Sequence, residues 1–111
     1  MIYDRAINIW NVGAGSSPLT RKLTAQGTYL CRILTVYRRT AFEARQLGES
    51  INRMVRMPYA EGVRATQYAT MEDGHVYKIT EARPDLDGDA LPVIELSLHR
   101  EEGRYDFIGS E

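Results

Sequence analysis

Short runs in which apolar and polar residues alternate follow one another along most of the chain, and this pattern predicts β-strands. The clearest run is Leu91–Arg100, where Ile94, Leu96 and Leu98 fall on one face and polar residues on the other. Weaker runs of the same kind are Arg5–Val12, Thr28–Arg39, Ile51–Met57, Arg64–Met71 and His75–Arg83. Because no βαβ spacing separates them, the pattern predicts a mainly β fold, a small antiparallel β-barrel or curled sheet of about six strands.

One segment carries helix signals instead of strand signals. Thr40 and Glu43 have the spacing of a capping box, in which a side-chain oxygen and an acid satisfy the first free amides of a helix. Gly48 stands where a helix end favours a residue that tolerates a left-handed backbone. The sequence therefore predicts one short helix over residues 36–48, inserted between two strands.

The remaining segments predict loops and turns. Residues 11–27 are rich in glycine, serine and threonine, which predicts a long flexible loop, and its basic pair Arg21 and Lys22 makes it a candidate contact arm. Glu72–Gly74 predicts a tight hairpin turn, because Asp-Gly readily supplies a positive φ. Pro84–Asp89 predicts an acidic loop. The polar tail, residues 101–111, holds only Tyr105, Phe107 and Ile108 as scattered apolar points.

Composition bounds the class of protein. One hundred and eleven residues, 43% of them apolar and 26% charged, predict a single soluble globular domain over residues 1–111. No apolar run approaches the roughly 20 residues that span a bilayer, and the first residues lack a secretory pattern, so neither a membrane span nor export is expected. Cys31 is the single cysteine and falls within a predicted strand, which predicts a buried, inert thiol.

Charge is divided unevenly along the chain although the net charge is only −1. Residues 1–70 carry an excess of six positive charges, and residues 71–111 carry an excess of seven negative charges. Either both sets are solvated faces of one domain, or each copy has a basic side and an acidic side. In the second case identical copies could dock side by side in a heterologous interface, which makes a ring if its rotation closes.

Signatures of catalysis and metal binding are weak. His75 and His99 each lie in a predicted strand without a cysteine or carboxylate at ligand spacing. Asp85–Asp89 resembles the start of a calcium loop, but Ala90 stands where the loop needs glycine and Leu96 where it needs the closing acid. We therefore expect no enzyme activity, no cofactor and no metal site.

Nucleic-acid binding is a further possibility that the sequence raises. Tyr29 and Tyr37 could stack on bases, and several arginines could line a basic stripe that contacts phosphates. These arginines are Arg32, Arg38, Arg39, Arg45, Arg53 and Arg56. A pI of about 6.1, and arginines on both strand faces, argue against sequence-specific binding. We therefore favour the interpretation that these arginines incidentally line a channel through which DNA passes.

Five segments, taken in their order along the chain, also carry a resemblance to a known protein family. They are Cys31–Leu34, Tyr37–Ala44, Arg53–Pro58, Asp73–Ile79 and Leu91–Leu98. Over roughly residues 28–100 the chain resembles the head–tail joining proteins of long-tailed bacteriophages and prophages, also called head-closure, adaptor or stopper proteins. Many members open with a short arginine-rich strand and a glycine turn, whereas this chain has the Gly/Ser-rich segment of residues 11–27.

The resemblance implies a structural role in the virion. Members are small β-barrels with a short helix and long loops, monomeric or weakly associated when isolated. They assemble as a ring under the portal once DNA is packaged, close the channel and form a platform for the tail. Their partners would be a portal or adaptor protein, a tail-completion protein and copies of themselves, with DNA passing through and no membrane involved. The location would be the bacterial host cytoplasm before assembly and the virion afterwards.

Under this hypothesis the candidate contacts fall in three places. Subunit or portal contacts would use Arg38, Arg39, Glu43 and Arg45, unless these simply form a solvated helix face. Acidic counterparts would be Asp85, Asp87 and Asp89. The element that orders or plugs the channel would be the predicted loop with Gly13, Gly15, Arg21 and Lys22.

A second hypothesis is a small monomeric β-barrel that binds single-stranded nucleic acid or a peptide. Its surface would combine the arginines with strand tyrosines, namely Tyr29, Tyr37, Tyr68 and Tyr77. Packing within the sheet is the competing interpretation of those tyrosines.

Overall fold

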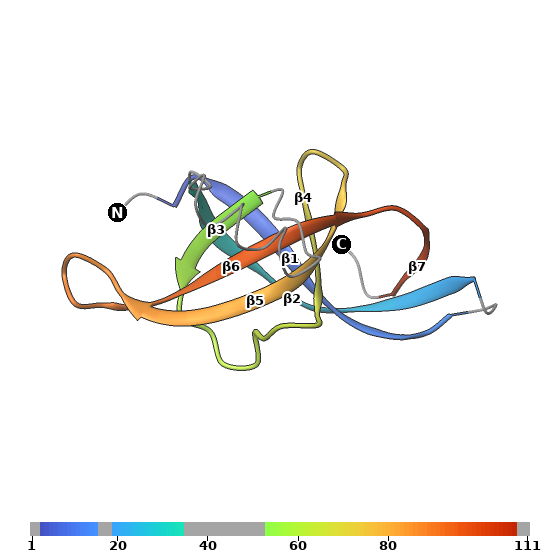
Figure 1. The fold of residues 1–111 in the computed structure, drawn as a ribbon, viewed down its shortest axis with the longest axis horizontal. Coiled ribbons are helices and arrows are strands. Elements are labelled where there is room, and N and C mark those ends of the chain that lie inside the picture. The colour runs from blue at the N-terminus through green and yellow to red at the C-terminus, as the bar shows by residue number, and fades with distance from the viewer. Residues whose placement is uncertain (1–2, 16–18, 35–52, 109–111) are drawn as a thin grey trace, which may run out of the picture.

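Seven β-strands make up the fold in the computed structural model, which describes residues 3–15, 19–34 and 53–108 (Figure 1). The strands are β1 Arg5–Ala14, β2 Thr20–Leu34, β3 Arg53–Pro58, β4 Tyr68–Met71, β5 Val76–Leu86, β6 Pro92–Glu101 and β7 Arg104–Ile108. The mainly β prediction is confirmed, and the described residues contain no helix. The helix predicted over residues 36–48 lies outside the described residues.

The strands pair in a circuit that returns to its starting strand. In spatial order they run β1-β4-β5-β6-β3-β2, and β2 also pairs with β1. All of these pairings are antiparallel. β7 stands outside the circuit and pairs in parallel with the first residues of β2. Each of the six strands in the circuit therefore has two partners, although the second partner covers only part of β1, β2 and β5.

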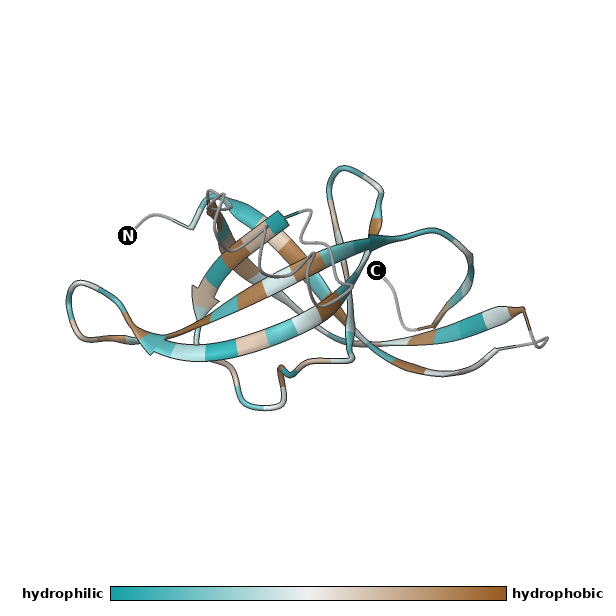
Figure 2. Ribbon diagram, viewed as in Figure 1, coloured by the Kyte–Doolittle hydropathy of each residue, from teal (hydrophilic) through white to brown (hydrophobic). Residues whose placement is uncertain are grey.

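The hydrophobic core faces the inside of this circuit. The alternation seen in the sequence puts Val55 and Met57 of β3 and Leu96 and Leu98 of β6 on the inner face, and Figure 2 shows this banding along the strands. Strands from both halves of the chain add to the cluster, including Ile7, Ile9, Cys31, Ala69, Met71, Tyr77, Ile79 and Ile94. Burial of such side chains contributes about 1.5–3 kcal/mol each and is the main stabilising term.

Strand β6 is buried on both faces. Ile94, Leu96 and Leu98 face the core as the alternation predicts. Glu95 and Ser97, expected to point away from the core on the opposite face of a half-buried strand, are only 8% and 5% exposed. Glu95 tolerates this burial because it is paired: Arg56 of β3 donates two hydrogen bonds to it and Arg83 of β5 donates a third.

The prediction of a flexible loop over residues 11–27 is wrong for its described residues. β1 and β2 pair continuously as far as Ala14 opposite Arg21, so most of the segment is a β-hairpin. A two-stranded ribbon is held chiefly by backbone hydrogen bonds and needs few apolar side chains. For this reason the glycine- and threonine-rich composition of residues 11–27 resembles that of a loop although the segment pairs as strands.

A β-bulge at Gln26 changes which face of β2 is turned inward. The pairing of Ile9 with Gly27 and of Trp10 with Ala25 leaves Gln26 as the extra residue. Gln26 accepts a hydrogen bond from Gln67, a buried side chain that also bonds Asn11 and the backbone of the β3–β4 connection. This buried amide ties the bulge to the loop that precedes β4.

The polar tail also differs from expectation, because residues 104–108 form β7. Phe107 packs edge-on against Trp10 with ring centroids 5.0 Å apart, and Tyr105 lies 5.9 Å from Tyr68. Trp10, Tyr68 and Leu23 form a second apolar cluster, separate from the main core, and Tyr105 packs against it. The apolar residues that look scattered along the tail thus meet partners from β1, β2 and β4.

Other boundaries shift by a few residues. The Asp-Gly turn is confirmed, since Gly74 has φ +79° and its amide donates to Met71. The strand predicted from Arg64 begins only at Tyr68. The predicted acidic loop is shorter than expected, because Pro84–Leu86 belong to β5 and pair with β6. A proline is tolerated there because pairing is already near the end of the strand.

The close approach at the end of the β1–β2 hairpin requires glycine at position 15. The Gly15 amide donates to the Thr20 carbonyl at 3.0 Å, and a Cβ at Gly15 would clash with that same backbone group. We predict that Gly15→Ala lowers the free energy of unfolding by about 1–3 kcal/mol in urea titrations, the usual cost of forced overpacking. Gly13→Ala is the control, since nothing lies within 4 Å of an added Cβ there. Equal stability of the two variants would contradict this.

Cys31 is fully buried in the main core, as its position in the sequence predicts. Burial, helped by the charges of Glu72 and Asp4, raises the pKa of the thiol to about 11. At pH 8 only about one thiol in a thousand would be ionised. We predict that a thiol-specific chromogenic reagent labels native Cys31 far more slowly than the urea-unfolded chain. Comparable rates in the two states would show that the thiol is accessible.

Candidate functional site

Two projecting elements lie at opposite ends of the long axis of the molecule (Figure 1). The first, here called the arm, comprises Asn11–Gly15, Leu19–Thr24 and strand β7. The second, here called the tip, is the end of the β5–β6 hairpin, Asp85–Leu91. The molecule measures 45 × 34 × 23 Å, so the two elements are separated by most of its length.

The tip is a firmly bonded turn. The carboxylate of Asp87 accepts backbone N–H bonds from Asp89 at 2.8 Å and Leu91 at 2.9 Å. These bonds, with that from Leu91 the stronger, hold the pKa of Asp87 below its usual range. Ala90 takes a left-handed backbone with φ 59° to complete the turn. Asp87 is therefore part of the architecture, whereas Asp85 and Asp89 are exposed and available to a partner.

Apolar side chains accompany the acids at the tip. Leu86 and Leu91 are each 59% exposed and stand on either side of the turn. Tyr59 is also exposed, and its amide donates to the carbonyl of Pro92 beside them. The tip thus combines an apolar centre with three carboxylates.

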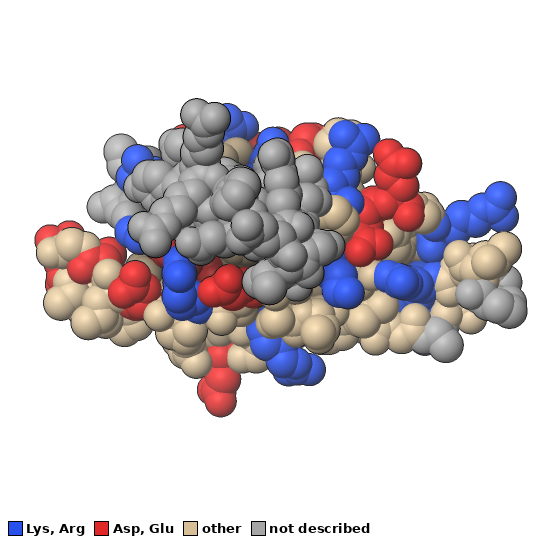
Figure 3. All heavy atoms as spheres, viewed as in Figure 1, with Lys and Arg blue, Asp and Glu red and all other residues tan. Residues whose placement is uncertain are grey.

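The arm carries the opposite charge. Arg21, Lys22 and Arg104 are exposed on it, and Asp106 of β7 lies opposite Lys22, so the net charge of the arm is positive. Figure 3 shows basic side chains at this extremity and acidic ones at the far extremity, with further acidic side chains on the same half of the molecule as the arm. Arg21 lies 5.6 Å over the Tyr68 ring and 3.9 Å from Glu101, which anchors the base of the arm. Exposed apolar side chains lie among these cations: Val12, Leu19, Phe107 and Ile108.

The candidate contact residues divide between these two elements. Asp85, Asp87 and Asp89 lie at the tip, and Gly13, Gly15, Arg21 and Lys22 lie on the arm. The structure does not bring the two groups together within one molecule. Arg38, Arg39, Glu43 and Arg45 lie outside the described residues.

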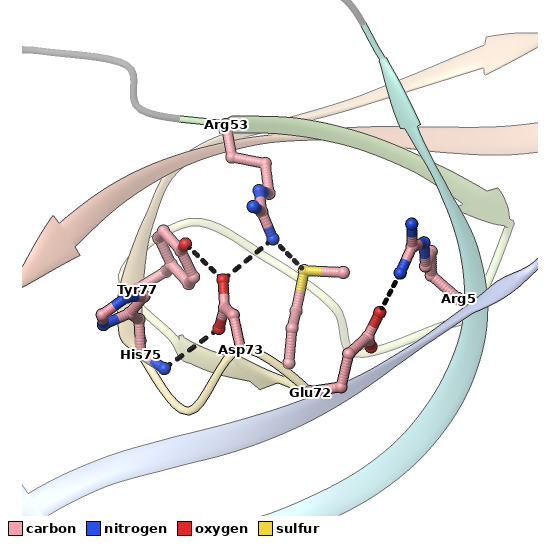
Figure 4. A network of polar contacts seen from close by, with 7 residues as sticks. Arg5, Arg53, Glu72, Asp73, His75 and Tyr77 are labelled. Carbon is pink, nitrogen blue, oxygen red and sulfur yellow. Dashed lines mark hydrogen bonds and ion pairs between the residues drawn. The ribbon is translucent and has the colours of Figure 1, made fainter.

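A polar network that the sequence analysis missed closes one end of the core (Figure 4). Arg53 at the start of β3 donates to Asp73 at 2.9 Å and lies over the Tyr77 ring. Asp73 also accepts from the Tyr77 hydroxyl at 2.8 Å and from the His75 amide at 3.0 Å. Beside it, Arg5 and Glu72 form an exposed ion pair. Only the Asp-Gly turn in the sequence hinted that Asp73 has a structural role.

The proposed basic stripe splits between two faces. Arg32 of β2 and Arg56 of β3 are cross-strand neighbours, and the row continues through Glu95 to Arg83. Arg53 occupies the opposite face of β3 and is bound to Asp73. The described arginines of the stripe therefore do not form one continuous cationic track.

The strand tyrosines are mostly packed rather than displayed. Tyr77 belongs to the main core and Tyr68 to the second cluster, where its ring is 1% exposed. Tyr29 is partly buried against the main core, and Tyr37 lies outside the described residues. The prediction that Tyr68 and Tyr77 form a binding surface is wrong, because their rings fill the interior.

Within the described ranges, no group of three or more histidine, cysteine, aspartate or glutamate side chains is placed to hold a metal ion. In the same part of the chain no helix has the length and apolar character needed to cross a membrane. No protein-family model matches this chain, and no curated protein has a significantly similar sequence.

Asp73 provides a test of the polar network. Burial raises its pKa, but the His75 amide, the Tyr77 hydroxyl and Arg53 outweigh burial, and the net pKa lies below the usual aspartate range. We predict that Asp73→Asn lowers the free energy of unfolding at pH 7 by about 1.5–3 kcal/mol, the usual value of hydrogen bonds to a charged group. Because the folded pKa is lowered, this contribution is complete above the ordinary aspartate pKa. It is lost as the pH falls through the lowered pKa.

The measurement is urea unfolding of both proteins over a series of acidic pH values. Glu72→Gln, in the same turn, is the matched control, and we expect a smaller change from it because the pair it breaks is exposed. A difference between wild type and Asp73→Asn that stays constant down to the most acidic pH would contradict the proposed role of the charge.

Proposed function

We propose that this chain is a structural virion or prophage protein that forms a ring at the head–tail interface. The ring would close the DNA channel after packaging and give the tail its platform. The proposed partners are the portal or adaptor protein, a tail-completion protein and further copies of this chain. DNA would pass through the ring without sequence-specific binding, and no catalytic step is involved.

The opposed charges of the two ends are the observation that carries this proposal. A basic arm and an acidic tip on one rigid body suit repeated contacts between identical copies. A closed ring requires such a heterologous surface, in which each subunit offers two different faces. A monomeric binding module has no need of it.

The strand order supports the same reading. We interpret the closed circuit β1-β4-β5-β6-β3-β2 as the small barrel that the family resemblance implies. The body is held by one continuous core, whereas the arm and the tip reach beyond it. A stable body with projecting hairpins suits a joint between larger assemblies.

The alternative function, a module for single-stranded nucleic acid or peptide, loses support from the packing of the tyrosines. A stacking platform needs exposed aromatic rings. Tyr68 and Tyr77 are buried in two separate clusters, and Tyr29 is packed against the core. The described arginines are also split between two faces of the sheet.

Light scattering coupled to size-exclusion chromatography tests the proposed function. The chain is run alone and after mixing with purified DNA-filled heads that carry a portal. We expect a small species alone and several copies on each head in the mixture. We further expect Arg38→Glu with Arg39→Glu to reduce the number of bound copies, because the reversed charges would repel the surface they contact.

Two controls make this experiment decisive. Arg39→Glu and Arg64→Glu change the net charge equally. Arg64 lies in the connection between β3 and β4, which is not among the proposed contacts, so only Arg39→Glu should weaken binding to heads. A chain that ignores the heads, yet binds an oligonucleotide with an affinity that falls steeply as salt rises, would refute the joint and favour the binding module.

A further inference from the structure

The exposed apolar side chains gather at the two charged ends. Eight large hydrophobic residues are exposed in the described part of the chain. Leu86 and Leu91 stand at the tip, and four others stand on the arm: Val12, Leu19, Phe107 and Ile108. Six of the eight therefore lie at the extremities, whereas scattered exposure would show no such preference. Concentrated apolar surface of this kind marks contact sites in soluble proteins.

The charges around these two apolar groups are complementary. Between Pro84 and Pro92 the chain has three aspartates and no basic residue. Between Val12 and Thr24 it has Arg21 and Lys22 and no acidic residue, and Arg104 lies beside them opposite Thr20. The tip therefore presents leucines within an acidic rim. The arm presents its apolar side chains among three cations and one acid, Asp106, which lies opposite Lys22. Such a pair of surfaces is suited to bind each other.

We propose that the tip of one copy docks on the arm of the next copy. Leu86 and Leu91 would pack against the apolar side chains of the neighbouring arm. Asp85 and Asp89 would face Lys22 and Arg104 across the rim. The inference deepens the proposed function, on which it rests for its biological setting, by naming the subunit contact within the ring.

The shape of the molecule makes this contact intermolecular. Tip and arm lie at opposite ends of a 45 Å axis, so one copy cannot satisfy its own surfaces. A contact between two different patches leaves a free tip at one end of a dimer and a free arm at the other. It therefore propagates, closing into a ring or extending as a filament according to the rotation between copies.

The size of the patches sets the expected strength. A stable pair of proteins buries about 800 Å² and takes about 20–30 residues from each partner. The tip, Asp85–Leu91, is only seven residues long. Association of the isolated chain is then weak, rises with protein concentration and falls with added salt, because exposed charges are screened within about 10 Å at 0.1 M salt. Heads carrying a portal would raise the local concentration and complete the ring.

Complementary charge reversal tests the contact. The tip variant combines Asp85→Lys with Asp89→Lys, and leaves Asp87 in place because its carboxylate holds the turn. The arm variant combines Lys22→Glu with Arg104→Glu, and leaves Arg21 in place because it packs on Tyr68. Sedimentation velocity at low salt and rising concentration is measured for wild type, for each variant and for an equal mixture.

Wild type should show a concentration-dependent increase in mass, and each variant alone should stay monomeric, because its two ends then have the same sign. The mixture should associate again, because every tip finds an arm of opposite sign on the other variant. Variants that associate like wild type, or a mixture that stays monomeric, would overturn the proposed contact. Far-ultraviolet circular dichroism of each variant checks that it has folded.

A matched control and a second readout separate this contact from the proposed function. Asp89→Lys and Glu61→Lys change the net charge equally, but Glu61 lies in the β3–β4 connection, so only Asp89→Lys should weaken association. If the tip variant still joins heads with the wild-type copy number, the contact is wrong and the joint stands. If the mixture associates but wild type never joins heads, the contact stands and the joint is wrong.

Discussion

Strand β2 is the constraint on which the rest of the structure depends. Its fifteen residues pair with β1 along most of their length, with β3 at the last three residues and with β7 at the first five. The strand circuit closes only because β2 runs on past β1 to reach β3. The bulge at Gln26 then allows Leu23 to face the outer cluster while Cys31 faces the core. A single strand thus builds the body and the arm, and the bulge aims its two halves at different clusters.

Two buried polar groups keep this arrangement specific. Gln67 bonds the bulge residue Gln26, Asn11 and the backbone at Gly62 and Arg64, so the β3–β4 connection is fixed against β1 and β2. Glu95 is paired with Arg56 and Arg83 on the outer face of the sheet. Leaving either group without its partners would cost about 1–3 kcal/mol or more, so a slipped strand register is disfavoured.

The body and the two projecting elements differ in what they contribute to the molecule. The main core and the two buried polar groups lie within the body, whereas the second cluster lies at the base of the arm and the tip lies outside both clusters. Among the described residues, the arm and the tip carry six of the eight exposed large hydrophobic side chains, and their net charges are opposite. Contacts made there would add little to the stability of one copy and could therefore vary with concentration and salt. Such a separation fits the ring subunit that we propose.

The sequence by itself determined the mainly β class, the inner faces of β3 and β6 and the turn at Asp73 and Gly74. These features rest on local rules: alternation in a strand is visible in adjacent residues, and a hairpin turn needs a residue that accepts a positive φ. The sequence also placed Cys31 in the interior and separated basic from acidic halves of the chain.

Only the tertiary structure decided the arm, β7 and the polar network around Asp73. Residues 11–27 have the composition of a loop, because pairing with a neighbouring strand stabilises the backbone whatever the side chains are. Phe107 looks solitary in the sequence, since Trp10, its partner, belongs to the first strand. The burial of Glu95 likewise depends on arginines brought in by β3 and β5. Contacts between residues far apart in sequence leave no local pattern, and the pairing of whole strands alone brings them together.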